Sequence, residues 1–291
     1  MTMDKKYEKL QNIIRAYESA LVAFSGGVDS AFVLKAARDV LGPDKVRAVT
    51  AQSQSLPARE FEASRELARE IGAEQIVIET REMEKEGYVE NTGERCYFCK
   101  ETLYEAMRPL AEEQGFKEIV NGTNLDDLGD FRPGLKAAAQ FGVKSPLVEA
   151  GFTKADVRHY ARLLGLSIAD KPAAACLSSR VPYGEKVTPE KLAQIEKCED
   201  YLKDLGFKVV RVRHHGSVAR IELGREEMPR FFDEVLRDQV TAAFQSFGFL
   251  YVTLDLQGYR LGSLNDARSG GGWPLVQPSL GDRPSEEKIG S

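Results

Sequence analysis

The chain has 291 residues, of which 42% are hydrophobic and 29% charged, and its formal net charge is −5. This composition is typical of a globular protein with one large or two medium domains. The acidic balance disfavours a nucleic-acid partner. No apolar run approaches the ~20 residues that span a bilayer, and the charged start of the chain does not resemble a signal peptide. Four irregularly spaced cysteines form no disulfide framework, so we expect a cytoplasmic protein without membrane contact.

Between residue 20 and about residue 165, apolar strand-like runs alternate with helical patterns. We expect strands at residues 20–24, 46–51, 75–79 and 118–121, with a fifth at 145–148. We expect helices at residues 30–41, 58–71, 98–115, 134–141 and 153–165. This order predicts an α/β fold with a doubly wound, Rossmann-like parallel sheet that binds ligands at the carboxyl ends of its strands.

The pattern changes after a proline-containing stretch at residues 165–184. Beyond it we expect the following order: a helix at 188–206, strands at 209–214 and 218–223, a long helix at 226–247 and a strand at 250–256. This predicts a smaller α+β domain. The expected organisation is therefore a nucleotide domain at 1–170, a second domain at 171–266 and a disordered tail at 267–291.

The segment Ser25-Gly26-Gly27-Val28-Asp29-Ser30 joins the first expected strand to a helix. Glycines allow a phosphate to approach the main chain, and the free N–H groups of the helix start, with two serine hydroxyls, can bind it. The Gly-Lys-Ser/Thr ending of a Walker A loop is absent. The segment resembles instead the SGGxDS pyrophosphate-binding loop (PP-loop) of enzymes that split ATP into AMP and pyrophosphate.

A second polar segment, Asn121-Gly122-Thr123-Asn124-Leu125-Asp126-Asp127, follows the fourth strand and should face the same cleft. Its small and amide side chains suit adenine or ribose, and Asp127 could bind Mg²⁺ beside phosphate. The alternative is an Asx-rich turn that caps a helix. Arg132 and Lys136, a few residues on, are candidates for stabilising the pyrophosphate leaving group.

Three cysteines follow strands of the expected sheet: Cys96 and Cys99 in a CxxC motif, and Cys176 in the proline-flanked loop. They could meet above the carboxyl edge of the sheet. Three thiolates without a clear fourth ligand fit a 4Fe-4S cluster with one open iron. Zinc, a dithiol or persulfide relay, and no shared site remain alternatives. Cys198 lies in a helix at a position that suits packing.

Two pairs of charged residues occupy alternate positions of the C-terminal strands. Arg211 and Arg213 share one face of their strand, as Arg220 and Glu222 do on the next. Paired guanidiniums can bind a phosphate or carboxylate. Taken by themselves, these residues favour the other reading, a solvated β face with cross-strand ion pairs.

Four segments together resemble the LarE family of ATP-dependent sulfurtransferases, over roughly residues 7–266. They are the glycine loop, residues 122–136, Ala175-Cys176-Leu177-Ser178-Ser179-Arg180-Val181-Pro182-Tyr183-Gly184, and Val210-Arg211-Val212-Arg213. The resemblance implies that ATP adenylates a carboxylate of pyridinium-3,5-biscarboxylic acid mononucleotide and that sulfur then displaces AMP, for nickel-pincer cofactor synthesis.

The resemblance also implies roles for individual residues. Arg211 and Arg213 would hold the substrate phosphate, with Ser179, Arg180, Glu199 and Glu222 lining the same pocket. Some family members sacrifice the sulfur of one cysteine at the position of Cys176, whereas others carry three cysteines around a 4Fe-4S cluster. Cys96, Cys99 and Cys176 match the second type. The resemblance further implies a homo-oligomer, namely a hexamer. It also implies that sulfide or another sulfur donor provides the sulfur.

Three other functions fit parts of the pattern. An ammonia-using ligase of the NAD or GMP synthetase type would need no clustered thiols. A tRNA thiolase with a cluster would bind tRNA in a salt-dependent manner, which the acidic composition argues against. An ATP-binding redox sensor would release no pyrophosphate.

Overall fold

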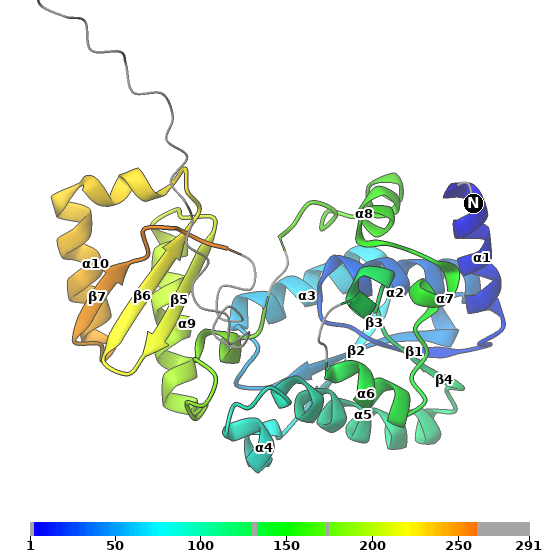
Figure 1. The fold of residues 1–291 in the computed structure, drawn as a ribbon. Helices are drawn as coiled ribbons and strands as arrows, with labels where there is room; N and C mark the ends of the chain where they lie inside the picture. The colour runs from blue at the N-terminus through cyan, green and yellow to red at the C-terminus, as the bar shows by residue number, and fades with distance from the viewer. Residues whose placement is uncertain (1–2, 130–132, 173–174, 261–291) are drawn as a thin grey trace, which may run out of the picture. The chain divides into compact units, whose positions relative to one another are not determined.

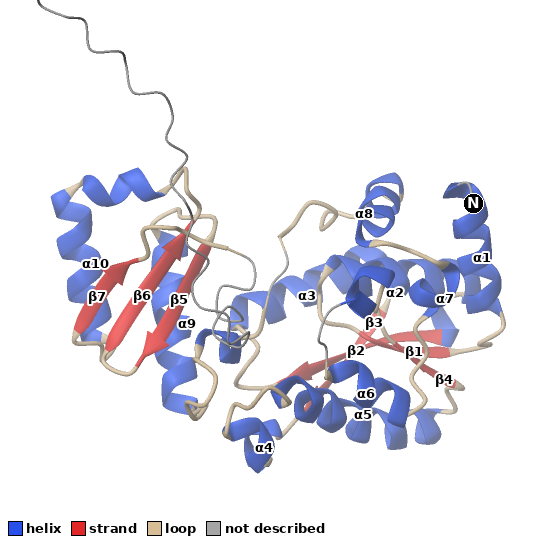
Figure 2. Ribbon diagram, viewed as in Figure 1, coloured by secondary structure: helices blue, strands red, loops and turns tan. Residues whose placement is uncertain are grey.

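The computed structural model describes residues 3–129, 133–172 and 175–260. The chain divides into two compact units, residues 1–259 and 260–291, and the description below concerns the first. Arg132 and the tail at 267–291 lie outside the described residues. The described helices and strands appear in chain order in Figure 1 and by type in Figure 2.

The first sheet consists of four parallel strands in the order β3-β2-β1-β4. They are β1 (Ala20–Ala23), β2 (Val46–Gln52), β3 (Glu74–Glu79) and β4 (Glu118–Val120). The central strand β1 is apolar and buried on both faces, as expected for a sheet that is covered on both sides. The predicted parallel α/β sheet is thus confirmed.

Helices cover both faces of this sheet (Figure 1). Ala20 and Val22 point into a core formed with α1 (Met3–Arg15), α2 (Val28–Leu41), α3 (Ala58–Ile71), α7 (Pro146–Ala150) and α8 (Lys154–Leu163). Leu21 and Ala23 point the other way, into a core formed with α5 (Arg95–Gln114) and α6 (Gly134–Gln140). A short helix, α4 (Glu86–Val89), precedes α5. The alternation of side chains along a strand produces these two cores.

The second sheet has three strands in the order β5-β6-β7. β5 (Val210–His215) and β6 (Val218–Leu223) form an antiparallel hairpin, and β7 (Tyr251–Leu254) adds in parallel to β6. Helices α9 (Pro189–Asp204) and α10 (Glu234–Ser246) contribute to its apolar core, which includes Cys198 at 0% exposure. Cys198 is therefore a packing residue.

Two expected elements are wrong. Residues 145–148 form no strand: Pro146 begins helix α7, and only Lys144 makes an isolated parallel bridge, to Val120. Proline lacks the N–H that a ladder needs, and its fixed φ suits the first turn of a helix. The long helix at 226–247 is divided, because a 3₁₀ turn at Met228–Phe232 ends at Asp233, which is extended and caps α10 by accepting from Leu236 N.

The boundary expected at residues 170 and 171 falls between the elements of the two sheets and stays a prediction. Among the described residues, no helix has both the length and the apolar character to cross a bilayer.

Candidate functional site

The glycine loop joins β1 to α2 and is braced by its two serines. Ser30 Oγ lies 3.2 Å from Ser25 Oγ and donates to the carbonyl of Gly27 at 3.0 Å. Gly26 has a φ of +71°, and a Cβ on it would lie 2.9 Å from Ser64 Cβ on α3. Gly27 is the N-cap of α2 and makes no side-chain cap bond. The loop therefore presents the start of a helix, a backbone arrangement that binds phosphate.

The second polar segment packs directly on this loop, as the sequence predicted. A Cβ on Gly122 would lie 2.6 Å from the backbone nitrogen of Ser30, so only glycine fits here. Asn124, which is 1% exposed, donates from Nδ2 to Asp29 Oδ1 at 3.1 Å. Thr123 N donates to Asn121 Oδ1 at 3.0 Å and so fixes the turn. The structure thus brings residues 25–30 and 121–127 together at one edge of the sheet.

Lys154 is a site residue that the sequence analysis missed. Its ammonium forms an ion pair with Asp29 Oδ2, and its backbone N–H donates to Asp126 Oδ2 at 2.8 Å. Lys154 is the first residue of α8, where Thr153 and Asp156 form a capping box. The sequence did contain a signal for this position. The Thr-x-x-Asp pattern predicts the start of a helix directly after the carboxyl edge of the sheet.

The other expected phosphate and metal residues lie in different places. Asp127 Oδ2 accepts from Asn124 N at 3.0 Å, beside the loop. Lys136 lies on α6 with its side chain 67% exposed and its ammonium 3.7 Å from Glu94. This position is beside the start of α5, where the CxxC motif lies. Arg132, the remaining leaving-group candidate, is outside the described residues.

Cys96 and Cys99 are one helical turn apart in the first turns of α5, and Cys176 immediately precedes the 3₁₀ turn η4 (Leu177–Arg180). All four cysteines of the chain are free thiols. Cys99 packs against an apolar cluster that contains Leu177, the residue after Cys176. The two cysteine segments are therefore neighbours in the fold.

Electrostatics also couples the three thiols. Burial raises the pKa of Cys99 to about 12, and the charges of Cys176 and Cys96 add to this effect while Lys100 opposes it. The pKa of Cys96, an exposed residue, is raised as well, first by desolvation beside its neighbours and then by the charge of Cys176, against the cations Arg95 and Lys100. An electrophilic metal centre would remove this mutual repulsion. Among the described side chains, however, no group of three His, Cys, Asp or Glu is already arranged to hold a metal ion.

Arg180 and Glu199 form a buried, bidentate ion pair beside Cys176. Nε and Nη2 of Arg180 donate to the two carboxylate oxygens at 2.8 and 2.9 Å. Nη1 donates to the carbonyl of Cys176 at 2.8 Å, and Glu199 Oε1 also accepts from Val212 N on β5 at 3.0 Å. The pair thus holds the Cys176 segment against the C-terminal sheet.

The predicted arginine face of β5 lies on the same side. Arg213 donates to Glu222 Oε2 at 2.7 Å and to the carbonyl of Ser179 at 2.9 Å. Glu222 is fully buried and also pairs with Arg220 at 3.2 Å. The pKa of Arg211 is lowered, first by burial and then by the charge of Arg180. An anion bound here would relieve this crowding of positive charge.

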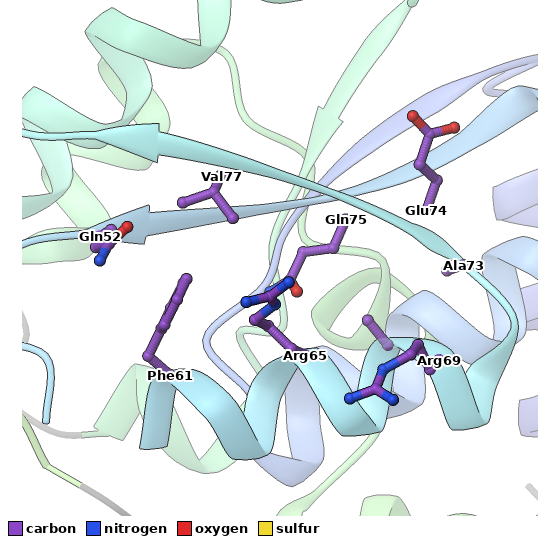
Figure 3. Close-up of a pocket in the computed structure, with 9 residues that line it drawn as sticks. Gln52, Phe61, Arg65, Arg69, Ala73, Glu74, Gln75 and Val77 are labelled. Atoms are coloured by element: carbon purple, nitrogen blue, oxygen red, sulfur yellow. The ribbon is translucent and has the colours of Figure 1, made fainter. Parts of the chain in front are cut away.

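An open pocket of about 620 Å³ lies between α3 and the edge strand β3. Figure 3 shows Phe61 and Arg65 on α3 pointing toward that strand. Gln75 of the pocket donates to Ser64 Oγ at 3.0 Å, and Ser64 supports Gly26 from behind. The pocket borders the back of the glycine loop, and its lining contains none of the predicted site residues.

A parallel sheet with an SGGVDS turn at its carboxyl edge defines an ATP pyrophosphatase of the PP-loop class. In agreement, the NAD synthase family model matches residues 4–105. The particular family follows from relatives that cover nearly the whole chain.

A protein of Lactiplantibacillus plantarum named pyridinium-3,5-bisthiocarboxylic acid mononucleotide synthase is 41% identical over 265 residues, 91% of this chain and 95% of its own length. An uncharacterised protein of Synechocystis sp. is 46% identical over 263 residues, 90% of this chain and 98% of its own. An uncharacterised protein of Methanocaldococcus jannaschii is 26% identical over 89% of this chain and 99% of its own. The chain belongs to the LarE family of ATP-dependent sulfurtransferases, which confirms the resemblance.

Proposed function

We propose that this chain converts a carboxylate of pyridinium-3,5-biscarboxylic acid mononucleotide into a thiocarboxylate, for nickel-pincer cofactor synthesis. The name of the L. plantarum relative supports this substrate. The observation that carries the proposal is the double attachment of η4. Ser178 O accepts from Arg95 beside the CxxC motif, and Ser179 O accepts from Arg213 beside Arg211. A sulfur source and an anion site therefore adjoin.

In the first step, a substrate carboxylate oxygen attacks the α-phosphorus of ATP. The bond from that phosphorus to the bridging oxygen breaks, and pyrophosphate leaves. The N–H groups at the start of α2 and the ammonium of Lys154 stabilise the departing charge. Mg²⁺ would bind through the carboxylates of Asp29 and Asp127 together with phosphate oxygens. Adenylation makes AMP a good leaving group from an otherwise unreactive carboxylate.

In the second step, hydrosulfide attacks the acyl carbon. The bond between this carbon and the AMP oxygen breaks, AMP leaves, and loss of a proton yields the thiocarboxylate. Arg180 donates to the carbonyls of Ala175 and Cys176 and so fixes the backbone that carries the Cys176 thiol.

Cys96, Cys99 and Cys176 would hold a 4Fe-4S cluster, since three thiol donors with nearby cations fit a cubane with one open iron. Bound there, the cluster would supply the labile sulfide for transfer. Burial alone would lower the pKa of Lys100, but the charges of Tyr104 and the three cysteines raise it. Lys100 therefore stays protonated and offsets the negative charge of the thiolates.

Arg211 and Arg213 would bind the phosphate of the mononucleotide. Both side chains lie on the face of β5 opposite the core residues Val210 and Val212. The guanidinium of Arg211 lies 5.2 Å from the ring centre of Tyr259, so an aromatic wall adjoins the cation. Ser179, Glu199 and Glu222 would orient these arginines.

The free state of all four cysteines supports a cytoplasmic reaction. A homo-oligomer, hexameric by resemblance, is part of the same proposal, with sulfide or a sulfur donor protein as the second substrate.

The test is to incubate the protein anaerobically with ATP, Mg²⁺, sulfide and the mononucleotide, and to measure pyrophosphate and the product mass. We expect pyrophosphate release that depends on the mononucleotide, and a product in which sulfur replaces oxygen. Release with ammonia and a nicotinate dinucleotide instead, or sulfur incorporation into tRNA, would assign one of the rival functions. The Asp29→Ala variant is the control, because it should release no pyrophosphate while keeping its melting temperature.

The cluster is tested separately by iron and acid-labile sulfide analysis of protein purified without oxygen. About four of each per chain are expected, and both should be lost in Cys176→Ala. Absence of iron even after reconstitution would give Cys176 a sacrificial role instead.

A further inference from the structure

The two cysteine segments are joined by hydrogen bonds that involve neither sulfur nor substrate groups. Arg95, the residue before Cys96, is 5% exposed. Its Nη1 donates to the carbonyl of Ser178 at 2.8 Å, two residues after Cys176. This bond crosses 83 positions of sequence and connects the first turn of α5 to η4. A buried guanidinium on one element that donates to the backbone of another limits the separation of the two elements.

Asn91 orients Arg95 and also forms hydrogen bonds to the segment that follows Cys176. Its Oδ1 accepts from Arg95 Nη1, and its Nδ2 donates to the carbonyls of Val181 and Pro182 at 3.2 and 2.7 Å. Asn91 is fully buried and has a φ of +52°, a left-handed conformation that asparagine tolerates better than most residues. This backbone conformation therefore directs the side-chain amide of Asn91 toward the segment that follows Cys176.

Apolar side chains of the two segments also pack against each other. Tyr88, Leu177, Val181 and Val187 form one buried cluster, and the Cys99 side chain packs against it. Tyr88 Oη lies 2.5 Å from Ser178 Oγ. Main-chain bonds from Gly184 N to Asn91 O and from Val187 N to Val89 O continue the pairing. Residues 88–95 and 177–187 thus form one continuous contact, with Arg95 at its cysteine end.

We propose that Arg95 is a positioning residue that holds Cys176 against the CxxC turn, so that the three thiols converge on one thiophilic ligand. The inference rests on the proposed sulfur site but assigns a role that this site alone does not require. The cation also faces the thiols, since the charges of Cys176 and Cys96 both act on Arg95. Geometry and charge can be separated by substitution, because lysine keeps the charge but its ammonium ends one bond short of the Nη1 that makes both hydrogen bonds.

The experiment is an anaerobic titration of the reduced, metal-free full-length protein with arsenite, followed by the near-ultraviolet absorbance of As–S bonds. Arsenite exchanges its oxygens for three thiolates without a change of oxidation state, so its affinity reports their convergence. Cys176→Ala defines the affinity of the remaining two thiols. We expect Arg95→Met to weaken arsenite binding about 10- to 100-fold, toward the Cys176→Ala value. Arg95→Lys should be weakened clearly as well.

Arg158→Lys is the matched control, because Arg158 also donates to two carbonyls, those of Ala169 and Lys171, away from the cysteines. Its arsenite affinity should equal that of the wild type. If Arg95→Met does not fold, Arg95→Lys and Asn91→Ala decide the question, with melting temperatures recorded for each. Asn91→Ala should also weaken binding, because it frees Arg95.

Wild-type affinity in Arg95→Lys would overturn the positioning role, since charge alone would then suffice. Equal affinity of wild type and Cys176→Ala would also overturn it, because the three thiols would not converge. Strong three-thiol binding of arsenite without any iron–sulfur centre in the anaerobic wild type is a different outcome. It would reject the proposed cluster and keep the convergence of the thiols, and weakened binding in the Arg95 variants would then still support the role of Arg95.

Discussion

Arg180 and Glu199 meet as a fork-to-fork ion pair, with Nε–Oε1 and Nη2–Oε2 distances of 2.8 and 2.9 Å. Neither residue is more than 2% exposed. The third nitrogen of Arg180, Nη1, donates to the carbonyl of Cys176, and Glu199 Oε1 also accepts from the backbone N–H of Val212. The family resemblance implied that both residues line the substrate pocket. Their bonds to protein groups favour a supporting role behind that pocket.

Glu199→Gln should lower the free energy of unfolding by about 3 kcal/mol at pH 7, because a buried guanidinium loses its countercharge. Burial alone would raise the pKa of Glu199, but the charge and hydrogen bonds of Arg180 outweigh it and lower the pKa. A carboxylate with a lowered native pKa stabilises the fold above its unfolded pKa and ceases to do so as pH falls through the native value. The difference between wild type and variant should therefore shrink below about pH 4.

Urea unfolding at a series of pH values measures this difference. Glu112→Gln, an exposed substitution on α5, should match the wild type at every pH. A destabilisation of Glu199→Gln that stayed constant from neutral to acidic pH would mean that packing, not charge, causes it.

Gly122→Ala should weaken ATP binding about tenfold or more, since the new methyl group would press on the Ser30 backbone from 2.6 Å. The dissociation constant for ATP, measured by calorimetry, checks this. Gly129→Ala is the matched control seven residues on, because among the described residues its Cβ would meet no atom within 4 Å. Equal weakening in both variants would indicate a general disturbance of the segment, not a contact with the loop.

Lys154→Met should reduce the rate of pyrophosphate release about 100-fold, as expected when one charged group that stabilises a leaving group is removed. Lys35→Met is the control, because Lys35 is a cation of the neighbouring helix whose partner is the surface residue Asp39. An unchanged rate in Lys154→Met would leave the Asp29 ion pair with a structural role only.

The parallel sheet and the meeting of residues 25–30 with 121–127 could be predicted because they depend on local signals. Apolar runs, glycine turns and the rule that ligands bind at strand ends all operate over short stretches of chain. The failed strand at 145–148 shows the limit of such signals. Its apolar residues fit a strand, but Pro146 started a helix.

Long-range partners could not be predicted in the same way. Lys154 pairs with Asp29 across 125 positions, and Arg95 reaches Ser178 across 83. The hydrophobic periodicity of the sequence does not indicate which buried guanidinium bonds to which carbonyl, because these partners depend on tertiary packing. The sequence thus indicated the cysteines of the proposed sulfur site but not the buried residues that join their two segments.

Arg211→Ala should raise the KM for the mononucleotide about 10- to 100-fold, because a charge-assisted bond to phosphate is lost. The KM for ATP should change much less, since the glycine loop is untouched. Lys208→Ala, an exposed cation just before β5, should leave both values unchanged. Steady-state kinetics with each substrate varied in turn measures the split. A rise confined to the KM for ATP would move the role of Arg211 from the substrate phosphate to the nucleotide.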